Sequence, residues 1–106
     1  MGKKEIIFTI VNVGFADEVM DKARKCGVKG GTIIHGRGTA NKSAEQFFDI
    51  SFSGEKEIVL MVVDSEIKDN VLKAIYEGVG LDSKGQGIAF SLPVEASVGL
   101  VEEIKK

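Results

Sequence analysis

The sequence predicts an α+β fold in which a four-stranded antiparallel sheet carries two helices on one face. Segments rich in Ile, Val and Phe alternate with two segments whose apolar residues recur at helical spacing. The resulting order is β-α-β, loop, β-α-β. The 106 residues are enough for one hydrophobic core, so we expect a single domain over residues 1–106.

The first β-α-β unit is expected before the loop. Lys4–Val13 is rich in Ile, Val and Phe and predicts a strand that Gly14 ends. Residues 15–26 carry an apolar stripe, acidic residues in the first turn and basic residues in the last, which complements the helix dipole. Gly27 is a typical residue after a helix C-terminus. Thr32–Arg37 then predicts the second strand.

The loop and the third strand follow. Residues 39–46 form a polar loop without proline. Phe47–Phe52 can extend as a strand, and residues 53–55 (Ser-Gly-Glu) are expected to break it. Glu57–Val63 is the strongest strand pattern in the chain, because six consecutive apolar residues follow Glu57.

The second helix and the last strand complete the expected fold. Asp64 and Ser65 are typical N-cap residues. The helix stripe that follows consists of Ile67, Val71, Ile75 and Val79. Gly87–Val94 predicts the last strand, and residues 95–106 are amphipathic and compatible with a short strand or a helix. This order is that of the ferredoxin-like βαββαβ sandwich.

Apolar residues on both faces of the predicted strands indicate that the sheet needs a partner. Two helices cover only one face, and a monomer should place polar residues on the other. Ile58–Val63 is apolar on both faces, and Ile6–Val11 is nearly so. Each uncovered side chain would forgo about 1.5–3 kcal/mol of burial. We therefore expect a closed homo-oligomer with ligand sites between subunits, the alternative being that the C-terminal segment folds over this face.

The composition argues against several classes of protein. The net charge of −2 does not suit a nucleic-acid-binding protein, which would carry a basic surface. Cys26 is the single cysteine, so an internal disulfide and a cysteine-based zinc site are excluded. No apolar run approaches the roughly 18 residues of a membrane span, and the start lacks the features of a signal peptide. We expect a cytoplasmic protein without direct membrane insertion and without a nucleic-acid partner.

Two glycine-rich turns carry the candidate ligand site. His35–Lys42 and Ser83–Gly87 each lie at the end of an apolar strand. Glycine lets backbone N–H groups approach a ligand, and Arg37, Lys42 and Lys84 supply positive charge. The pattern predicts an anion site without a catalytic nucleophile, so no enzyme is expected. The alternative is that the glycines make tight turns only and that the cations are solvated.

Both turns resemble motifs of the P-II signal-transduction proteins, the nitrogen-regulatory trimers, and of their short P-II-like relatives. Residues 26–38 (CGVKGGTIIHGRG) resemble the second strand entering the family's T-loop, and residues 85–90 (GQGIAF) resemble its glycine-rich B-loop. The resemblance covers nearly the whole chain. It implies a homotrimer that binds adenine nucleotide in three clefts, each between the T-loop base and B-loop of one subunit and a C-terminal loop of the next.

The resemblance also implies positions for the site. Thr32 and Gly38 match ligand-contacting residues near the T-loop base, and Gly85 and Gly87 match the B-loop glycines. The expected ligand-binding residues are Thr32, Arg37, Gly38, Thr39, Lys84, Gly85, Gln86 and Gly87. The loop at residues 39–46 is expected to regulate a partner protein, an enzyme or a transporter. Its docking residues would be Ala40, Asn41, Lys42 and Ser43.

The chain departs from the family at the positions that bind phosphate. The family has a lysine after the second B-loop glycine, and this chain has Ile88. The family's C-terminal loop carries an Arg-x-Arg pair, whereas Val98–Val101 contains no arginine. The loss of these cations removes charge-assisted phosphate contacts. AMP or ADP is therefore a better candidate ligand than ATP, and an unrelated anion is the alternative.

Two other functions use the single histidine, His35. A divalent-metal-binding trimer resembling the CutA proteins would combine His35 with acidic loop residues. A small lyase or isomerase on the same fold would pair His35 with Glu45 or Asp49. Because a second histidine is missing, we assign no metal-binding residues.

Overall fold

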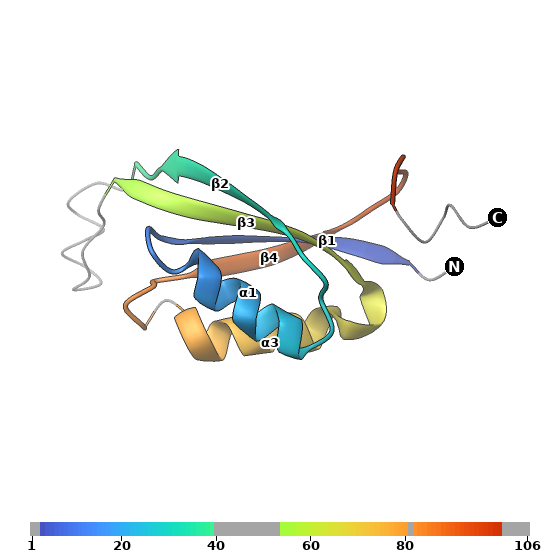
Figure 1. Ribbon diagram of the computed structural model, residues 1–106, viewed down its shortest axis with the longest axis horizontal. Coiled ribbons are helices and arrows are strands. Elements are labelled where there is room, and N and C mark those ends of the chain that lie inside the picture. Colours follow the sequence, from blue (N-terminus) through green and yellow to red (C-terminus); the bar gives the residue numbers. More distant parts are fainter. Residues whose placement is uncertain (1–2, 40–53, 81, 101–106) are drawn as a thin grey trace.

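The elements of the computed structural model follow the predicted order (Figure 1). The structure describes residues 3–39, 54–80 and 82–100. The strands are β1 (Lys4–Asn12), β2 (Thr32–Arg37), β3 (Glu55–Asp64) and β4 (Ile88–Pro93). The helices are α1 (Ala16–Lys25) and α3 (Ser65–Val79). The predicted loop residues Ala40–Ser43, the predicted strand Phe47–Phe52 and residues 101–106 lie outside the described residues.

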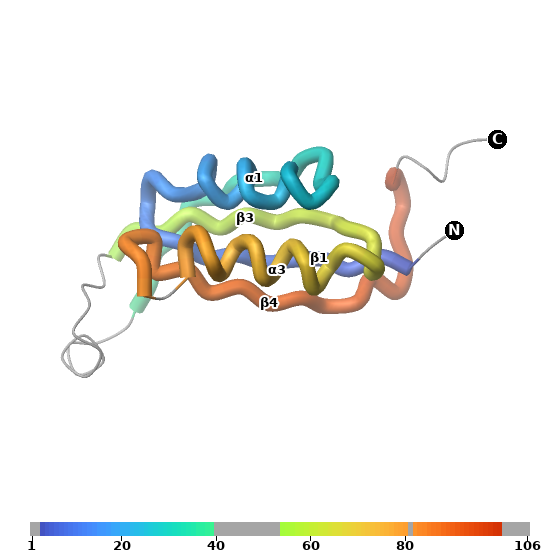
Figure 2. Tube along the Cα trace, turned by 90° about the horizontal axis from the view of Figure 1, so that it is seen from below, coloured from blue at the N-terminus to red at the C-terminus, as the bar shows by residue number. Residues whose placement is uncertain are grey.

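The four strands form one antiparallel sheet in the order β2-β3-β1-β4, and both helices cover the same face (Figures 1 and 2). This arrangement confirms the predicted α+β, ferredoxin-like fold. The long central strands β1 and β3 pair along their whole length, from Lys4 opposite Asp64 to Asn12 opposite Lys56. Neither helix of the described chain has the length and apolar character needed to cross a membrane.

The core lies between the sheet and the helices. The strands contribute every second residue to it, as their period requires. The fully buried members include Ile7, Val11, Val59, Met61, Val19, Ala23, Val71, Ile75 and Val79. The predicted stripes of both helices supply most of the helical share. Thr9 is also fully buried here, and its hydroxyl has no hydrogen-bond partner.

The opposite face of the sheet is uncovered by the described chain and is apolar over its central part. Strand alternation and register place one set of side chains on this open face. Its central part consists of Ile6, Phe8, Ile10, Thr32, Ile34, Ile58, Leu60, Val62, Ile88, Phe90 and Leu92, and its two ends carry Lys4 with Asp64 and Asn12 with Gly36 and Lys56. Ile88 remains 52% exposed and Leu92 48%. The rings of Phe8 and Phe90 stack at its centre, with centroids 5.3 Å apart.

Three local predictions need correction. The strand β3 begins at Glu55, which was expected to break the chain, because Arg37 pairs with Glu55 and the N–H of Gly38 donates to Gly54 at 2.6 Å. The sheet ladder thus continues to the base of the loop. Residues 95–100 form neither a helix nor a strand.

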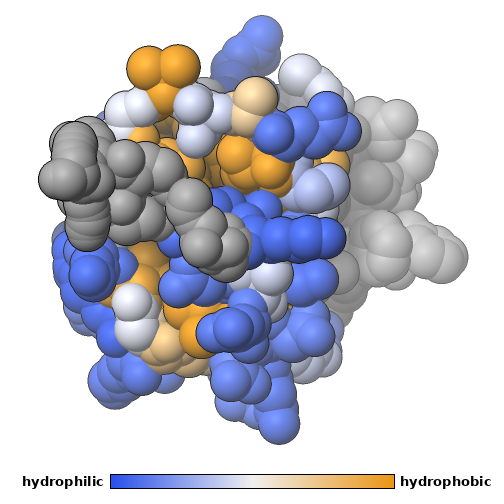
Figure 3. All heavy atoms as spheres, turned by 90° about the vertical axis from the view of Figure 1, so that its right-hand side faces the viewer, coloured by the Kyte–Doolittle hydropathy of each residue, from blue (hydrophilic) through white to orange (hydrophobic). Residues whose placement is uncertain are grey.

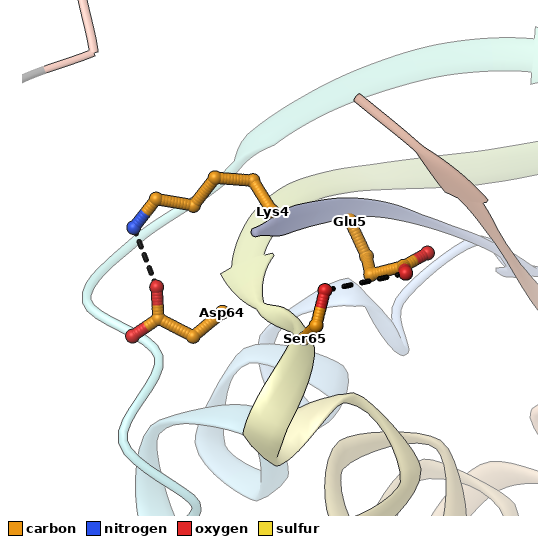
Figure 4. A network of polar contacts seen from close by, with 4 residues as sticks. All are labelled: Lys4, Glu5, Asp64 and Ser65. Carbon is orange, nitrogen blue, oxygen red and sulfur yellow. Dashed lines mark hydrogen bonds and ion pairs between the residues drawn. The ribbon is translucent and has the colours of Figure 1, made fainter. Parts of the chain in front are cut away.

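The start of α3 is the third correction. Asp64 occupies the N-cap position, but its side chain makes no capping hydrogen bond. Its carboxylate instead binds the ammonium of Lys4, and the hydroxyl of Ser65 donates to Glu5 at 3.3 Å (Figure 4). Both contacts join the start of α3 to the start of β1, so the predicted cap residues serve tertiary structure.

Candidate ligand site at the two ends of the sheet

Both glycine turns reach the same end of the sheet. β2 ends at Arg37, beside the first residues of β3, and Gly38 and the exposed Thr39 follow it. The second turn is attached to the end of β1, because the N–H of Asn12 donates to the carbonyl of Gly85 at 2.9 Å. This end lies on the left in Figures 1 and 2. We call it the turn end.

Lys56 and Asn12 join the two turns, although sequence analysis assigned neither to the site. A side chain at Gly38 would have its Cβ 3.1 Å from Cε of Lys56, so the Lys56 stem lies against the first turn. The Lys56 ammonium donates to Oδ1 of Asn12 at 2.8 Å. Nδ2 of Asn12 donates to the carbonyl of Lys84 at 3.0 Å and to Oε1 of Gln86 at 3.2 Å. Partial burial lowers the pKa of the Lys56 ammonium from its ordinary value.

Hydrogen bonds within the protein use most backbone N–H groups of the second turn. Those of Ser83, Gly85, Gln86 and Gly87 donate to Gly80 O, Ser83 Oγ, Ser83 O and Val79 O, respectively. The glycines are required by packing: a Cβ at Gly87 would overlap the Val79 carbonyl, and one at Gly85 would lie 3.2 Å from the Phe15 ring. An anion at this end would therefore meet the cationic side chains rather than these N–H groups.

His35 contacts Glu57 rather than the acidic residues considered for it. Its Nε2 lies 3.5 Å from Oε2 of Glu57, while Glu45 and Asp49 are outside the described residues. Oε1 of Glu57 accepts the N–H groups of Gly14 and Ala16, each at 3.0 Å, and so caps α1 from a neighbouring strand. Within the described part of the chain, no group of three or more His, Cys, Asp or Glu could hold a metal.

A hollow of about 710 Å³ lies at the other end of β2. Its main walls are residues 27–32, the end of β3 and the start of α3, with Leu100 beside them. The ion pair of Lys4 and Asp64 lies at this end (Figure 4), where Figure 3 shows hydrophilic residues around smaller apolar areas. Because Thr32, the first residue of β2, pairs with Leu60, the last four residues of β3 extend beyond β2. The edge of this part of β3 faces the hollow.

The structure does not bring all predicted site residues together in one chain. Thr32 lines the hollow, whereas Arg37, at the other end of β2, lies at the turn end with Lys84. Five strand steps separate Thr32 from Arg37, which is roughly 17 Å. One copy of the protein therefore places the predicted site residues in two groups, one at each end of β2.

Comparison with known proteins decides the family. No protein-family model matches the chain. A curated protein of Methanosarcina barkeri, "Nitrogen fixation nifHD1 region GlnB-like protein 1", is 30% identical over 92 residues, covering 86% of this chain and 88% of that protein. The chain belongs to the P-II family.

Solved structures agree with this P-II assignment. Arabidopsis thaliana PII bound to citrate superposes with a TM-score of 0.65 at 27% identity, covering 88% of this chain and 78% of that one. The Bacillus subtilis GlnK–ATP complex superposes with a TM-score of 0.63 at 19% identity, covering 88% and 83%. At this lower identity the likeness concerns the fold alone. This protein is thus a P-II-like signal-transduction protein.

The fold shows where this P-II chain departs from the family pattern. Ile88, at the position for which the resemblance implies a phosphate-binding lysine, lies on the open face and pairs with Ile10. Together with Ile58 and Ile34, these residues form a row of isoleucines across all four strands. The position at which the resemblance implies a phosphate-binding lysine is therefore part of the apolar face in this chain.

Proposed function

We propose that this P-II protein is a homotrimeric sensor that binds AMP or ADP in clefts between subunits and regulates an enzyme or a transporter. The observation that carries the proposal is the division of the site. Thr32 and the hollow lie at one end of the sheet, and the cations lie at the other. A ligand that contacts both half-sites needs two copies of the chain.

The hollow suits the base of a nucleotide. Val28, Leu60 and Ile67 supply apolar walls, and the outer edge of β3 extends beyond its pairing with β2. A strand edge offers alternating N–H and C=O groups, which match the donor and acceptors on the edge of adenine. The hydroxyl of Thr32 adds one more polar group at the rim.

The turn end suits the phosphate. Arg37, Lys56 and Lys84 come from β2, β3 and the second turn, and Asn12 and Lys56 connect these elements. Cationic side chains form stronger hydrogen bonds to phosphate than neutral groups do. Most backbone N–H groups of the second turn bind other protein atoms, so the phosphate would be held by these three cationic side chains alone. Fewer contacts to phosphate favour a short phosphate chain, which supports AMP or ADP over ATP.

The open face supports assembly. It presents apolar side chains from all four strands, including Ile34, Val62 and Phe90, each at least 40% exposed. Packing these faces around a threefold axis would bury them. By resemblance to the family, the C-terminal segment of one subunit would contact the turn end of the next subunit. Leu100, in this segment, lies beside the hollow of its own chain, so the hollow of one subunit would face the turn end of the next.

Regulation would act through the loop at residues 39–46, without catalysis. Gly38 forms the base of this loop, since its N–H binds Gly54 across the strand ends. A ligand held by the neighbouring Arg37 would favour one loop state over another, and the partner protein would bind that state. We place this activity in the cytoplasm, with no nucleic acid and no membrane insertion.

Mixing of two variants tests the shared cleft. Thr32→Val together with Ile67→Gln, on α3, damages only the hollow, and Lys84→Gln together with Arg37→Gln damages only the turn end. Calorimetry with AMP and ADP should show that each variant trimer binds weakly by itself. After subunit exchange in an equal mixture, about one quarter of the clefts should regain full affinity, because they combine two intact half-sites. Recovery of no sites would contradict a cleft between subunits.

A further inference from the structure

We infer that Asn12 is a positioning residue of the ligand site, which sets the spacing between the cations of β3 and those of the second turn. The inference rests on the proposed function, because it assigns a role in the same site. Asn12 is the last residue of β1, on the side of the open face. It does not need to touch the ligand to act.

The hydrogen bonds of Asn12 connect four parts of the chain. Its backbone N–H donates to Gly85, and its carbonyl accepts the N–H of Phe15 at 3.2 Å, just before α1. Its side chain uses both ends: Oδ1 accepts from Lys56, and Nδ2 donates to Lys84 and Gln86. A side-chain amide, which has a donor and an acceptor, can make these contacts at once.

Asn12 attaches the second turn to the end of β1, through its backbone N–H and through Nδ2. Its own hydrogen bonds, centred on Ser83, set its internal shape. Gln86 has a φ of 50°, in the left-handed region that non-glycine residues rarely adopt. The bond from Nδ2 of Asn12 to Oε1 of Gln86 attaches the side chain of this residue to the end of β1.

The consequence concerns charge spacing. Asn12 binds the ammonium of Lys56 directly, and it binds the backbone carbonyl of Lys84. One side chain therefore holds the ammonium of Lys56 and the backbone from which the Lys84 side chain extends. An anion that contacts both lysines is selected by this spacing.

The variant Asn12→Asp separates these contacts. The carboxylate keeps the size of the side chain and still accepts from Lys56, but it cannot donate to Lys84 or Gln86 and would repel both oxygens. We expect affinity for AMP and ADP to fall by about tenfold or more, because two hydrogen bonds that position the turn are lost. NMR amide signals of residues 83–87 should shift in the unliganded protein, while those of residues 28–33 should not. Asn70→Asp, the same change on the exposed surface of α3, is the matched control.

A double-mutant cycle distinguishes positioning from general stability. In a Lys84→Gln background the spacing between the two cations no longer matters, so Asn12→Asp should cost only the repulsion of its added negative charge, clearly less than in the wild-type background. Gln86→Met removes one of the two contacts and provides a second variant, with a smaller loss of affinity in the same direction. Equal affinity of Asn12→Asp and wild type, or an equal loss in both backgrounds, would overturn the inference alone. A wild-type protein that binds neither AMP, ADP nor inorganic phosphate would overturn the proposed function and the inference with it.

Discussion

The substitution Phe90→Glu should convert the protein from an oligomer to a monomer. Phe90 is 44% exposed in a single copy and stacks on Phe8 at the centre of the open face. Full burial of a phenylalanine stabilises by about 1.5–3 kcal/mol, so covering the remainder contributes roughly 0.7–1.3 kcal/mol per copy. Five residues of this face are exposed by 40–52%: Ile34, Val62, Ile88, Phe90 and Leu92. By the same scale, their burial contributes roughly 3–7 kcal/mol per copy.

Phe90→Glu should reduce the free energy of association by more than the contribution of Phe90 alone. Each copy would place a carboxylate in an apolar contact, and an unpaired charge there costs several kcal/mol. That cost is comparable with the whole gain from the face. Each tenfold weakening of association needs only about 1.4 kcal/mol, so the variant should dissociate at micromolar concentration.

Light scattering coupled to size-exclusion chromatography measures the outcome. The wild type should have the mass of three copies of the 11.4 kDa chain, and Phe90→Glu the mass of one, with an unchanged far-ultraviolet circular dichroism spectrum. Tyr76→Glu is the control, because Tyr76 is a 66% exposed aromatic residue on α3, in the helix layer. It should leave the mass unchanged. A monomeric wild type, or a Phe90→Glu protein of unchanged mass, would refute the role of the open face.

Three further predictions concern single residues. Gly87→Ala should lower the free energy of unfolding in urea by about 1–3 kcal/mol, since its Cβ overlaps the Val79 carbonyl, whereas Gly30→Ala, with no atom nearby, should change it little. Thr9→Val should raise the thermal midpoint, because it removes a buried hydroxyl without a partner, and a lower midpoint would argue against this. A bound anion should raise the lowered pKa of Lys56, so affinity for the anion should fall as the pH rises through that pKa. Binding at such a pH should take up protons. Calorimetry in two buffers of different ionisation enthalpy should detect this uptake in the wild type and not in Lys56→Gln.

Periodicity in the sequence was sufficient to predict the architecture. The helical stripe of Val71, Ile75 and Val79 is buried, and the run Ile58–Val63, apolar at every position, contributes to the core and to the open face. Such patterns are local, so they survive without knowledge of the partner strands. Strand ends were less predictable, because Glu55 joins β3 only through its pairing with Arg37.

The polar contacts at the turn end could not be predicted from local periodicity in the sequence. Glu57 caps α1 across 41 residues of sequence, and Asn12 reaches the second turn across more than 70. Each contact depends on the register of the sheet, and the run Ile58–Val63, apolar at every position, lacks the alternation that would mark the register in the sequence. The glycines Gly85 and Gly87 gave an ambiguous signal, since close packing and close approach to a ligand both require glycine. Only the structure shows the packing.

The separation of Thr32 from Arg37 along β2 has a thermodynamic consequence under the proposed function. A nucleotide would bind the assembled ring and not the isolated chain, so every occupied cleft would add its binding free energy to the association of its neighbours. Dilution and ligand depletion would then act as equivalent signals. The cell could tune the threshold of response through the abundance of the protein alone.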